Sequence, residues 1–376
     1  MPISQRCNGI YDCSDQSDEN ECQTVLIDKD KYKKSMPPNP KEKTLKVNVS
    51  MVLFTINEIS LPSTFDVKVG VKLKWIDYRL DFKHLKKNTN IVDDITKKEL
   101  WIPPLAFINA YGNHRIKTDE ISTVEIISRG KFEYLDMAEL HEGQIYKGSE
   151  NPLLYSREYQ LVFQCHYYLV HFPFDTQECT IDLEVPKFLQ SFVKLVPDYA
   201  KYEGRIILDQ FSVNNITIAS AMNETVVRAK IYLKRMPAYH MATTYLPTSC
   251  IIFMAMATLF IDQSHFDAII TVALTIMLVM YTLFQSIAAS MPSTAYLKLL
   301  DHWLIFGMLL PFVVFMFEVV NEMLNQMPQN WVIPVGQVEI AIPKDKCIQL
   351  GRWIVPILAI SYISCYILFV IVIPSA

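Results

Sequence analysis

Hydroxyl-bearing side chains recur along one apolar stretch of the sequence, which runs from His265 to Pro292. Steps of four and three residues would place the members of this stripe on one face of a helix. The stripe comprises Thr271, Thr275, Leu278, Thr282 and Ser286, and Ala289 extends it. Hydroxyl groups can replace part of an ion's hydration, and a ring of leucines can close a pore by dewetting. We therefore predict a pore lining with Leu278 as its gate; the alternative is a bundle helix whose Ser and Thr bond their own backbone.

An acidic residue, Asp267, stands at the start of the same stretch. Several copies of the helix around one axis would form a carboxylate ring, which attracts cations. A carboxylate near a helix N-terminus is also favourable as a cap, and the two roles are compatible. We expect Asp267 to set selectivity and inorganic cations to permeate, with an anion-selective pore as the alternative.

The composition indicates a membrane protein with a polar N-terminal part. Half of the 376 residues (51%) are hydrophobic, and the net charge of −4 argues against nucleic acid as a partner. Charged residues crowd the part before Arg235, so we expect a pore domain over 237–376 that lies in the lipid bilayer. Four apolar segments there are each near the ~20 residues that a spanning helix needs. These segments are 239–261, 266–288, 302–324 and 352–373.

The part before the apolar segments reads as strands. Residues 67–75 alternate apolar and polar side chains, a period of two. Turn signals separate similar short runs, and no long helical pattern interrupts them. These runs are 123–127, 159–165, 179–183, 205–211 and 228–233. We predict an antiparallel β-sandwich over 44–236, preceded by a charged, proline-containing linker over 23–43.

Three glycosylation sequons and the cysteine spacings indicate an oxidising compartment. The sequons lie at Asn48, Asn215 and Asn223. The start, MPISQRCNGI, lacks the apolar region of a signal peptide, so we expect the natural precursor to begin upstream. Four spans would leave the sandwich and the C-terminus on the same side. We therefore expect a multi-pass protein of the plasma membrane with the sandwich outside the cell.

Two cysteines, Cys165 and Cys179, flank a short loop with Phe172-Pro173-Phe174-Asp175 at its centre. A disulfide between them would remove roughly 3 kcal/mol of chain entropy from the unfolded state. With four membrane segments following, this pattern resembles the Cys-loop receptors, the pentameric ligand-gated ion channels. The resemblance covers about 44–373. It implies a homopentamer, a small-molecule or ion ligand, and a pore formed by five copies of 266–289.

The same resemblance implies how the two parts communicate. In the family, Asp175 of the loop would pair with Arg235 before the first span. Phe172 and Pro173 belong to the same loop, and Glu58 in the INEIS turn is a second acidic candidate for coupling. The segment from Pro292 onward, after the pore helix, would be what these loops move.

The agonist site departs from the family pattern. Aromatic side chains that hold amine transmitters in the family align with Gly70, Ile108 and Pro186 here. Phe107 and Phe188 stand next to two of these positions and are the remaining aromatic candidates. We therefore expect a ligand that is not a transmitter amine held in an aromatic cage.

The N-terminal residues 1–22 resemble the C-terminal half of an LDL-receptor class A module. Three cysteines and several carboxylates lie in CNGIYDCSDQSDENEC. By that resemblance Cys7 and Cys22 would pair. A structural calcium ion would be held by Asp12, Asp18 and Glu19.

No phosphate loop, nucleophile elbow or zinc-hydrolase spacing supports an enzyme. The alternatives left open are a channel gated by protons, zinc or a lipid-like amphiphile, and a non-conducting adhesion or assembly subunit that uses the class A module. Histidines that permit proton or zinc sensing lie at His84, His114, His141, His166 and His171.

Overall fold

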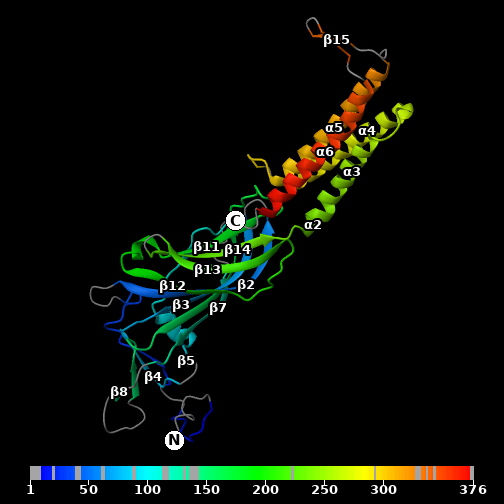
Figure 1. The fold of residues 1–376 in the computed structure, drawn as a ribbon. Helices are drawn as coiled ribbons and strands as arrows, with labels where there is room; N and C mark the ends of the chain where they lie inside the picture. Colours follow the sequence, from blue (N-terminus) through cyan, green and yellow to red (C-terminus); the bar gives the residue numbers. More distant parts are fainter. Residues whose placement is uncertain are drawn as a thin grey trace. The chain divides into compact units, whose positions relative to one another are not determined.

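The computed structural model folds into two compact units. One unit comprises residues 1–166, 178–208 and 213–233, and the other comprises 167–177, 209–212 and 234–376. The structure describes residues 10–18, 22–38, 44–60, 64–86, 90–111, 118–129, 133–134, 144–221, 224–291, 294–326, 332–335, 338–341 and 344–372. Figure 1 labels the elements of both units.

The described residues of the first unit form three β-sheets. The largest has the strand order β12-β2-β3-β10-β7-β5. In that order its strands are Val193–Tyr202, Leu45–Ser60, Thr64–Trp75, Leu153–Gln164, Thr118–Ile126 and Asn90–Ile91. The second sheet, β13-β14-β11-β6, contains Phe211–Ala221, Val226–Arg235, Thr176–Glu184 and Ala106–Phe107. The third, β1-β4-β9-β8, contains Val25–Ile27, Leu80–Lys83, Gln144–Lys147 and Glu133–Tyr134, and a short helix, α1, spans Asp94–Glu99.

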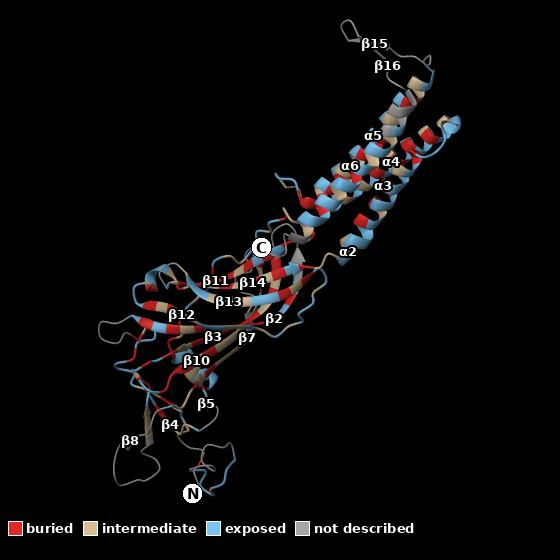
Figure 2. Cartoon of the chain, viewed as in Figure 1, coloured by how far each residue is buried: buried red, intermediate tan, exposed pale blue. Residues whose placement is uncertain are grey.

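The alternation predicted for 67–75 is present in β3, where every second side chain is buried. These side chains form a core between the two larger sheets, since a strand sends successive residues to opposite faces. Phe107 of β6 packs edge-on against Phe163 of β10, with ring centroids 5.5 Å apart. Figure 2 shows buried residues along β2, β3 and β10. The sandwich prediction is confirmed in its layered architecture.

Three details differ from the sequence expectation. The pair β12–β2 is parallel, whereas β2–β3, β3–β10 and β10–β7 are antiparallel. The strand predicted over 205–211 is wrong, because regular pairing begins only at Phe211. The segment expected to be a linker contains β1, which pairs with β4. The apolar residues of 205–211 suggested a strand, yet Ile206 and Ile207 are exposed (66% and 67%) in an irregular connection.

In the part of the second unit that the structure describes, four helices are long and apolar enough to cross a membrane. They are 238–258, Phe266–Ser290, Leu299–Gln326 and 351–370. The first is divided into α2 (Ala238–His240), a π-helical turn (Met241–Tyr245) and α3 (Leu246–Thr258). The others are α4, α5 and α6, and α6 begins earlier, at Lys344. A short hairpin of β15 (Val332–Val335) and β16 (Val338–Ala341) lies between α5 and α6 in the sequence.

Buried aromatic side chains hold α3, α5 and α6 together. The Tyr245 and Tyr366 hydroxyls hydrogen bond at 2.7 Å, and the Trp303 indole donates to the Thr248 hydroxyl at 2.9 Å. The Tyr366 hydroxyl also donates to the Leu299 carbonyl. Hydrogen bonds of this kind satisfy polar groups that would otherwise face hydrocarbon. These hydrogen bonds fix the positions of the helices against which α4 packs.

Candidate functional site

The predicted stripe lies on one exposed face of α4. Every residue of the stripe is exposed in the chain, and Leu278 has 63% of its surface accessible. The buried face of the helix carries Ile269, Ala273, Ile276 and Met280. The packed face is therefore apolar and the stripe lies outside it, where Val272, Leu274, Val279 and Tyr281 are also exposed, by 40–51%.

Contacts with α3 and α5 orient that packed face. Ile276 and Met280 share an apolar cluster with Ile251 and Ala255 of α3. On α5, Gly307 lets the helices approach closely, because a Cβ atom there would lie 2.7 Å from the Met280 methyl carbon. A larger residue at Gly307 would push α4 away or rotate it. The orientation of the stripe is therefore set by small and apolar residues on neighbouring helices.

The stripe hydroxyls bond the helix's own backbone. Thr271 donates to the Asp267 carbonyl at 2.8 Å, and Thr275 donates to the Thr271 carbonyl at 2.7 Å. Thr282 donates to the Val279 carbonyl at 2.8 Å. These bonds are the ones expected for a bundle helix, yet the side chains remain exposed. Because each proton is donated to the backbone, each oxygen offers its lone pairs outward, and lone pairs are what a cation requires.

Asp267 lies in the first turn of α4 and is exposed. The helix has no side-chain cap hydrogen bond at its N-cap residue, His265. Among the described residues the Asp267 carboxylate forms no ion pair. The Asp267 carboxylate is therefore exposed at the N-terminal end of the stripe, where it could interact with an ion.

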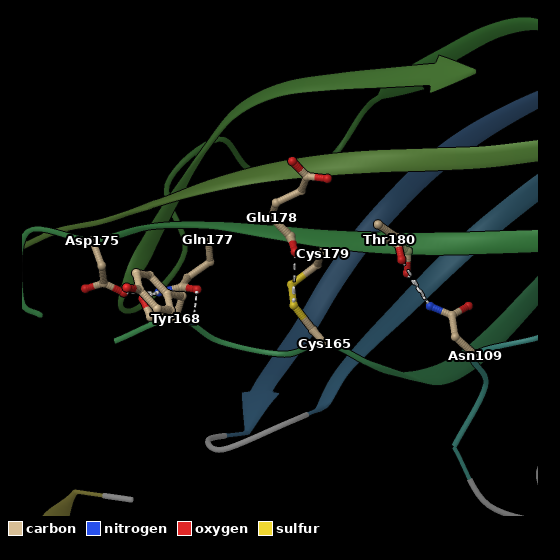
Figure 3. The surroundings of a disulfide bond; sticks show 8 residues. All are labelled: Asn109, Cys165, Tyr168, Asp175, Gln177, Glu178, Cys179 and Thr180. Carbon is tan, nitrogen blue, oxygen red and sulfur yellow. Dashed lines mark hydrogen bonds between the residues drawn. A yellow bond between two sulfur atoms is a disulfide. The ribbon is translucent and has the colours of Figure 1, made fainter. Parts of the chain in front are cut away.

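The predicted disulfide joins Cys165 to Cys179, with Cα atoms 5.1 Å apart. Figure 3 shows the bond between two neighbouring chain segments, one of which continues as β11. Asn109 donates to the Thr180 carbonyl and ties the segment after β6 to β11. This prediction from the sequence is confirmed.

Within the second unit, Asp175 and Arg235 form the ion pair that the resemblance implied. The guanidinium donates from Nε to Asp175 Oδ1 at 2.7 Å and from an Nη atom to Oδ2 at 3.2 Å. Both side chains are almost fully buried, with 1% and 2% of their surfaces exposed. A backbone bond from Arg235 N to the Asp175 carbonyl, at 3.1 Å, adds a further link. Such a two-point pair specifies geometry as well as charge.

Two aromatic rings enclose the guanidinium of this pair. Its centre lies 4.7 Å from the Phe172 ring and 4.3 Å from the Phe211 ring. The negative faces of aromatic rings favour a cation between them. Phe172 also contacts the His240 ring edge-on at 4.7 Å. The role predicted for Phe172 thus gains a physical basis, and the sequence had not indicated Phe211.

Two glutamine side chains complete the surroundings and were also missed. Gln177 donates to Asp175 Oδ2 and to the Tyr168 carbonyl, and its amide oxygen accepts from Tyr168 N at 2.9 Å. Figure 3 shows Gln177 beside both residues. Gln210 accepts from Arg235 at 3.3 Å. A glutamine carries no charge pattern or periodicity, so only the position two residues after Asp175 could have suggested Gln177.

The loop that carries Asp175 is bonded to the start of α5 and the residues before it. Leu299 N donates to the Val170 carbonyl at 2.7 Å, and Leu300 N donates to the Phe172 carbonyl at 3.2 Å. Leu169 N donates to the Tyr296 hydroxyl at 3.0 Å. The loop, the chain after α4 and α5 therefore form one connected network within the second unit.

Some of the predicted coupling residues are placed only in part. The Phe172–Pro173 bond is cis. Pro292 lies outside the described residues. Glu58 belongs to β2, where it is opposite Asp66 in the register, and its side chain is outside what the structure describes. The roles of Glu58 and Pro292 stay predictions.

Burial raises the pKa of the Tyr167 phenol, in the loop between Cys165 and Cys179, above its usual value, and the positive charge of Arg235 opposes this shift.

The position expected for one binding aromatic, Gly70, is covered by another ring. A Cβ atom at Gly70 would lie 2.9 Å from a ring carbon of Phe54. The Lys68 ammonium lies 5.7 Å from the centre of the Phe54 ring and pairs with Glu158 at 2.8 Å. The aromatic ring at the position of Gly70 is therefore supplied by Phe54 of the neighbouring strand β2, and Lys68 lies beside that ring.

The other candidate ligand-binding residues lie in different surroundings. Phe107 is a core residue, edge-on to Tyr159 with ring centroids 5.2 Å apart. Burial raises the pKa of the Tyr159 phenol to about 12. Ile108 is 45% exposed and Phe188 is 74% exposed. Pro186 precedes the short helix that carries Phe188. Phe188 remains a candidate for contact with a ligand, whereas Phe107 is enclosed by the core.

The N-terminal candidates are described in part. Cys22 is disulfide-bonded, while Cys7 and Glu19 lie outside the described residues. Asp18 is buried, and its Oδ2 accepts from Asp12 N at 2.5 Å. Within the part of the chain that is described, no group of three or more His, Cys, Asp or Glu could hold a metal ion. The calcium site stays a prediction.

The sequons differ in setting. Asn215 is exposed on β13, and Asn48 is half-buried on β2. Asn223 lies outside the described residues.

Fold and site together define a membrane protein with an N-terminal β-sandwich and four membrane-spanning helices. The family described as "Neurotransmitter-gated ion-channel ligand binding domain" matches residues 19–246, more than half of the chain. The chain belongs to this family of ligand-gated ion channels, which is not a family of enzymes.

Relatives share this pattern at low identity. The chain is 23% identical to the gamma-aminobutyric acid receptor subunit rho-2 of Homo sapiens over 291 residues, which covers 74% of this chain and 58% of the relative. It is 24% identical to the glutamate-gated chloride channel subunit beta of Haemonchus contortus over 293 residues, 72% of this chain and 62% of the relative. It is 23% identical to the gamma-aminobutyric acid receptor subunit rho-1 of Rattus norvegicus over 293 residues, which covers 74% of this chain and 56% of the relative. The chain thus spans less than two thirds of the length of these relatives.

Proposed function

We propose that this chain is one subunit of a homopentameric ligand-gated channel of the plasma membrane that conducts cations. The pore is formed by five α4 helices, with Leu278 as the closed gate. The observation that carries the proposal is the exposed hydroxyl face of α4, opposite the face packed by Ile269, Ala273, Ile276 and Met280. One helix cannot enclose water, so this face requires further copies around an axis.

Cation selectivity is supported by the direction of the hydrogen bonds on that face. The protons of three stripe hydroxyls point to backbone carbonyls, so their oxygens are free to accept. Five Asp267 carboxylates at the mouth add a potential that attracts cations at close range. Oxygen ligands and negative charge together favour a cation over an anion.

A chloride pore is the second candidate, because one relative is named a glutamate-gated chloride channel. The two candidates are separated by the reversal potential of the open channel. We would use Leu278→Thr, in which a hydroxyl replaces the apolar gate and current flows without a known agonist. Tenfold dilution of external sodium chloride shifts the reversal potential negative by about 59 mV for a perfectly cation-selective pore.

A positive shift in that experiment would refute cation selectivity and establish the chloride alternative. The same recording with Asp267→Ala tests the role of the carboxylate ring. We expect the negative shift to shrink, because the hydroxyl oxygens remain while the charged mouth is lost.

The ligand of the proposed channel is a small molecule or ion that is not held in an aromatic amine cage. This is supported by Gly70, whose position is covered by Phe54 with Lys68 beside it. Recording current while transmitters and pH are screened tests the proposal, and saturable micromolar activation by acetylcholine or serotonin would contradict it.

Gating in this proposal passes through the buried pair of Asp175 and Arg235. The pair, the loop backbone and the start of α5 are linked by the hydrogen bonds described above. A buried pair is difficult to break on one side only, so it suits a latch that moves as a unit. An Arg235 variant that folds, assembles and gates normally would remove the pair from the mechanism.

A further inference from the structure

A cavity of about 610 Å³ lies within the first unit, at the ends of strands β2 and β3. Its size falls in the range of sites for small organic ligands. It is lined by Thr44, Leu45, Lys46, Asn48, Lys74, Trp75, Ile76, Tyr78, Arg129, Ser149, Glu150 and Pro152. None of the agonist-site or pore candidates is among these residues, so the cavity is not used by the proposed function.

Backbone contacts hold the walls of this cavity in place. The turn after β9 approaches residues 77–80 so closely that a Cβ atom at Gly148 would lie 2.2 Å from the Asp77 carbonyl oxygen. Gly148 N donates to the Leu80 carbonyl at 2.9 Å. Arg129 N donates to the Asn151 side chain at 2.9 Å. A glycine is required at this approach, and the wall formed by Ser149 and Glu150 is therefore preorganised.

The lining carries an excess of positive charge. Lys46, Lys74 and Arg129 line the cavity together with one acidic residue, Glu150. Among the described residues, none of the three cations belongs to an ion pair, although Lys46 lies near enough to Glu224 to help lower the pKa of that carboxyl. Lys72, the preceding outward residue on β3, is not part of the lining. The lining therefore carries more positive than negative charge.

The lining also offers apolar surface. Leu45, Trp75 and Pro152 are buried, while Ile76 and Tyr78 contribute exposed side chains, 44% and 45% accessible. Apolar surface beside positive charge suits a ligand that carries both an anionic group and an apolar body.

We propose that this cavity binds a small organic anion, a carboxylate with an apolar or aromatic body. The carboxylate accepts from the lysines and Arg129, while the body lies on the apolar wall. An inorganic anion would leave that wall unused, and a cation would meet three like charges. The site lies wholly in the first unit, so binding does not depend on ion conduction or on which ion permeates.

The glycosylation sequon at Asn48 opens onto the same cavity. A sugar attached there is a second potential occupant, and its chemistry is neutral and polar. The test must therefore separate a free anion from the chain's own glycan. A protein made in a host that adds N-glycans, compared with the same protein after enzymatic removal of the glycan, makes this distinction.

The experiment is a calorimetric titration of the full chain in detergent with 4-phenylbutyrate, and with the neutral 4-phenylbutanamide as a matched ligand. Titration into empty micelles corrects for partition. We expect saturable binding of the acid, and affinity for the amide that is at least about fivefold weaker. Raising the salt concentration should weaken binding of the acid and leave the amide unchanged.

Three variants locate the site. Lys74→Met and Lys46→Met should each weaken binding of the acid about three- to tenfold, since each removes one charge from a partly solvated site. Lys72→Met, on the same face of the same strand, is the control and should leave binding within about twofold. Melting curves verify that each variant is folded.

Four results would overturn the proposal. They are equal affinity for acid and amide, equal loss in Lys72→Met and Lys74→Met, absence of saturable binding up to about 10 mM, and binding that appears only after the glycan is removed. The last result would assign the cavity to the sugar on Asn48.

Discussion

Breaking the buried pair of Arg235 and Asp175 should strongly destabilise the second unit. Arg235→Met would leave the Asp175 carboxylate, 2% exposed, with Gln177 as its remaining side-chain partner. Asp175→Leu would leave the guanidinium with Gln210 and two aromatic rings. Removing one partner of a buried pair costs about 3–5 kcal/mol, because the other charge stays buried. At about 2–4 °C per kcal/mol, the melting temperature should fall by roughly 6–20 °C.

The double variant Arg235→Met with Asp175→Leu should recover most of that loss. Replacing a buried ion pair by apolar side chains of similar volume is often neutral or stabilising. A charge swap should recover less, because it would put a carboxylate between the negative faces of Phe172 and Phe211. If the pair acts as a latch, the double variant should fold and assemble but fail to gate. Melting monitored by size-exclusion chromatography in detergent measures the effect on stability, and current recording measures the effect on gating.

A matched control is the pair of Arg228 and Asp182, which has similar hydrogen-bond distances of 2.7 and 2.8 Å. Its arginine is 36% exposed, so Asp182→Leu, which leaves that arginine behind, should cost about 1 kcal/mol or less. Equal melting shifts for Asp182→Leu and Asp175→Leu would refute the argument from burial. So would an additive double variant, because additivity means that the two side chains are not coupled.

The remaining predictions concern assembly, pore and ligand. Native mass measurement in mild detergent should give a homopentamer, and a stable monomer, dimer or tetramer would contradict it. Leu278→Thr should raise spontaneous current, whereas Met277→Thr, half-buried and off the stripe, should change it less. In recordings of the Leu278→Thr channel, Asp267→Lys should abolish cation current or reverse its selectivity, and unchanged reversal potentials would exclude the carboxylate ring. Acetylcholine, serotonin, gamma-aminobutyric acid and glycine should not activate the channel at micromolar levels, because Gly70, Ile108 and Pro186 stand where the cage is expected.

Periodic and spaced patterns in the sequence predicted much of the architecture. The period of two in 67–75 predicted a half-buried strand, and β3 has that burial. Four apolar segments predicted four membrane helices, which are present with shifts of a few residues at their ends. The steps of four and three in the stripe predicted residues on one side of a helix, and those residues are exposed on α4. These features are local, because a helix or strand repeats its own geometry along the chain.

Features that depend on contacts distant in the sequence were not predictable in this way. The run 205–211 is apolar enough for a strand, yet before Phe211 it forms only an isolated bridge at Ile207. The two rings around Arg235 come from residues 172 and 211, and Gln210 comes from a third position without any motif. Gln177, Gln210 and Phe211 became visible only when the fold brought them to one charge.

The sequence by itself indicated the identity of the elements and the disulfide, because spacing and period are written along the chain, whereas the pairing of Asp175 with Arg235 came from the family resemblance. The tertiary structure alone decided what surrounds them. It turned Phe107 into a core residue, covered Gly70 with Phe54, and gathered Lys46, Lys74 and Arg129 in the lining of one cavity. The physical reason is that packing and desolvation depend on which side chains meet in space, and residues 46, 74 and 129 meet only after distant strands of the large sheet have paired.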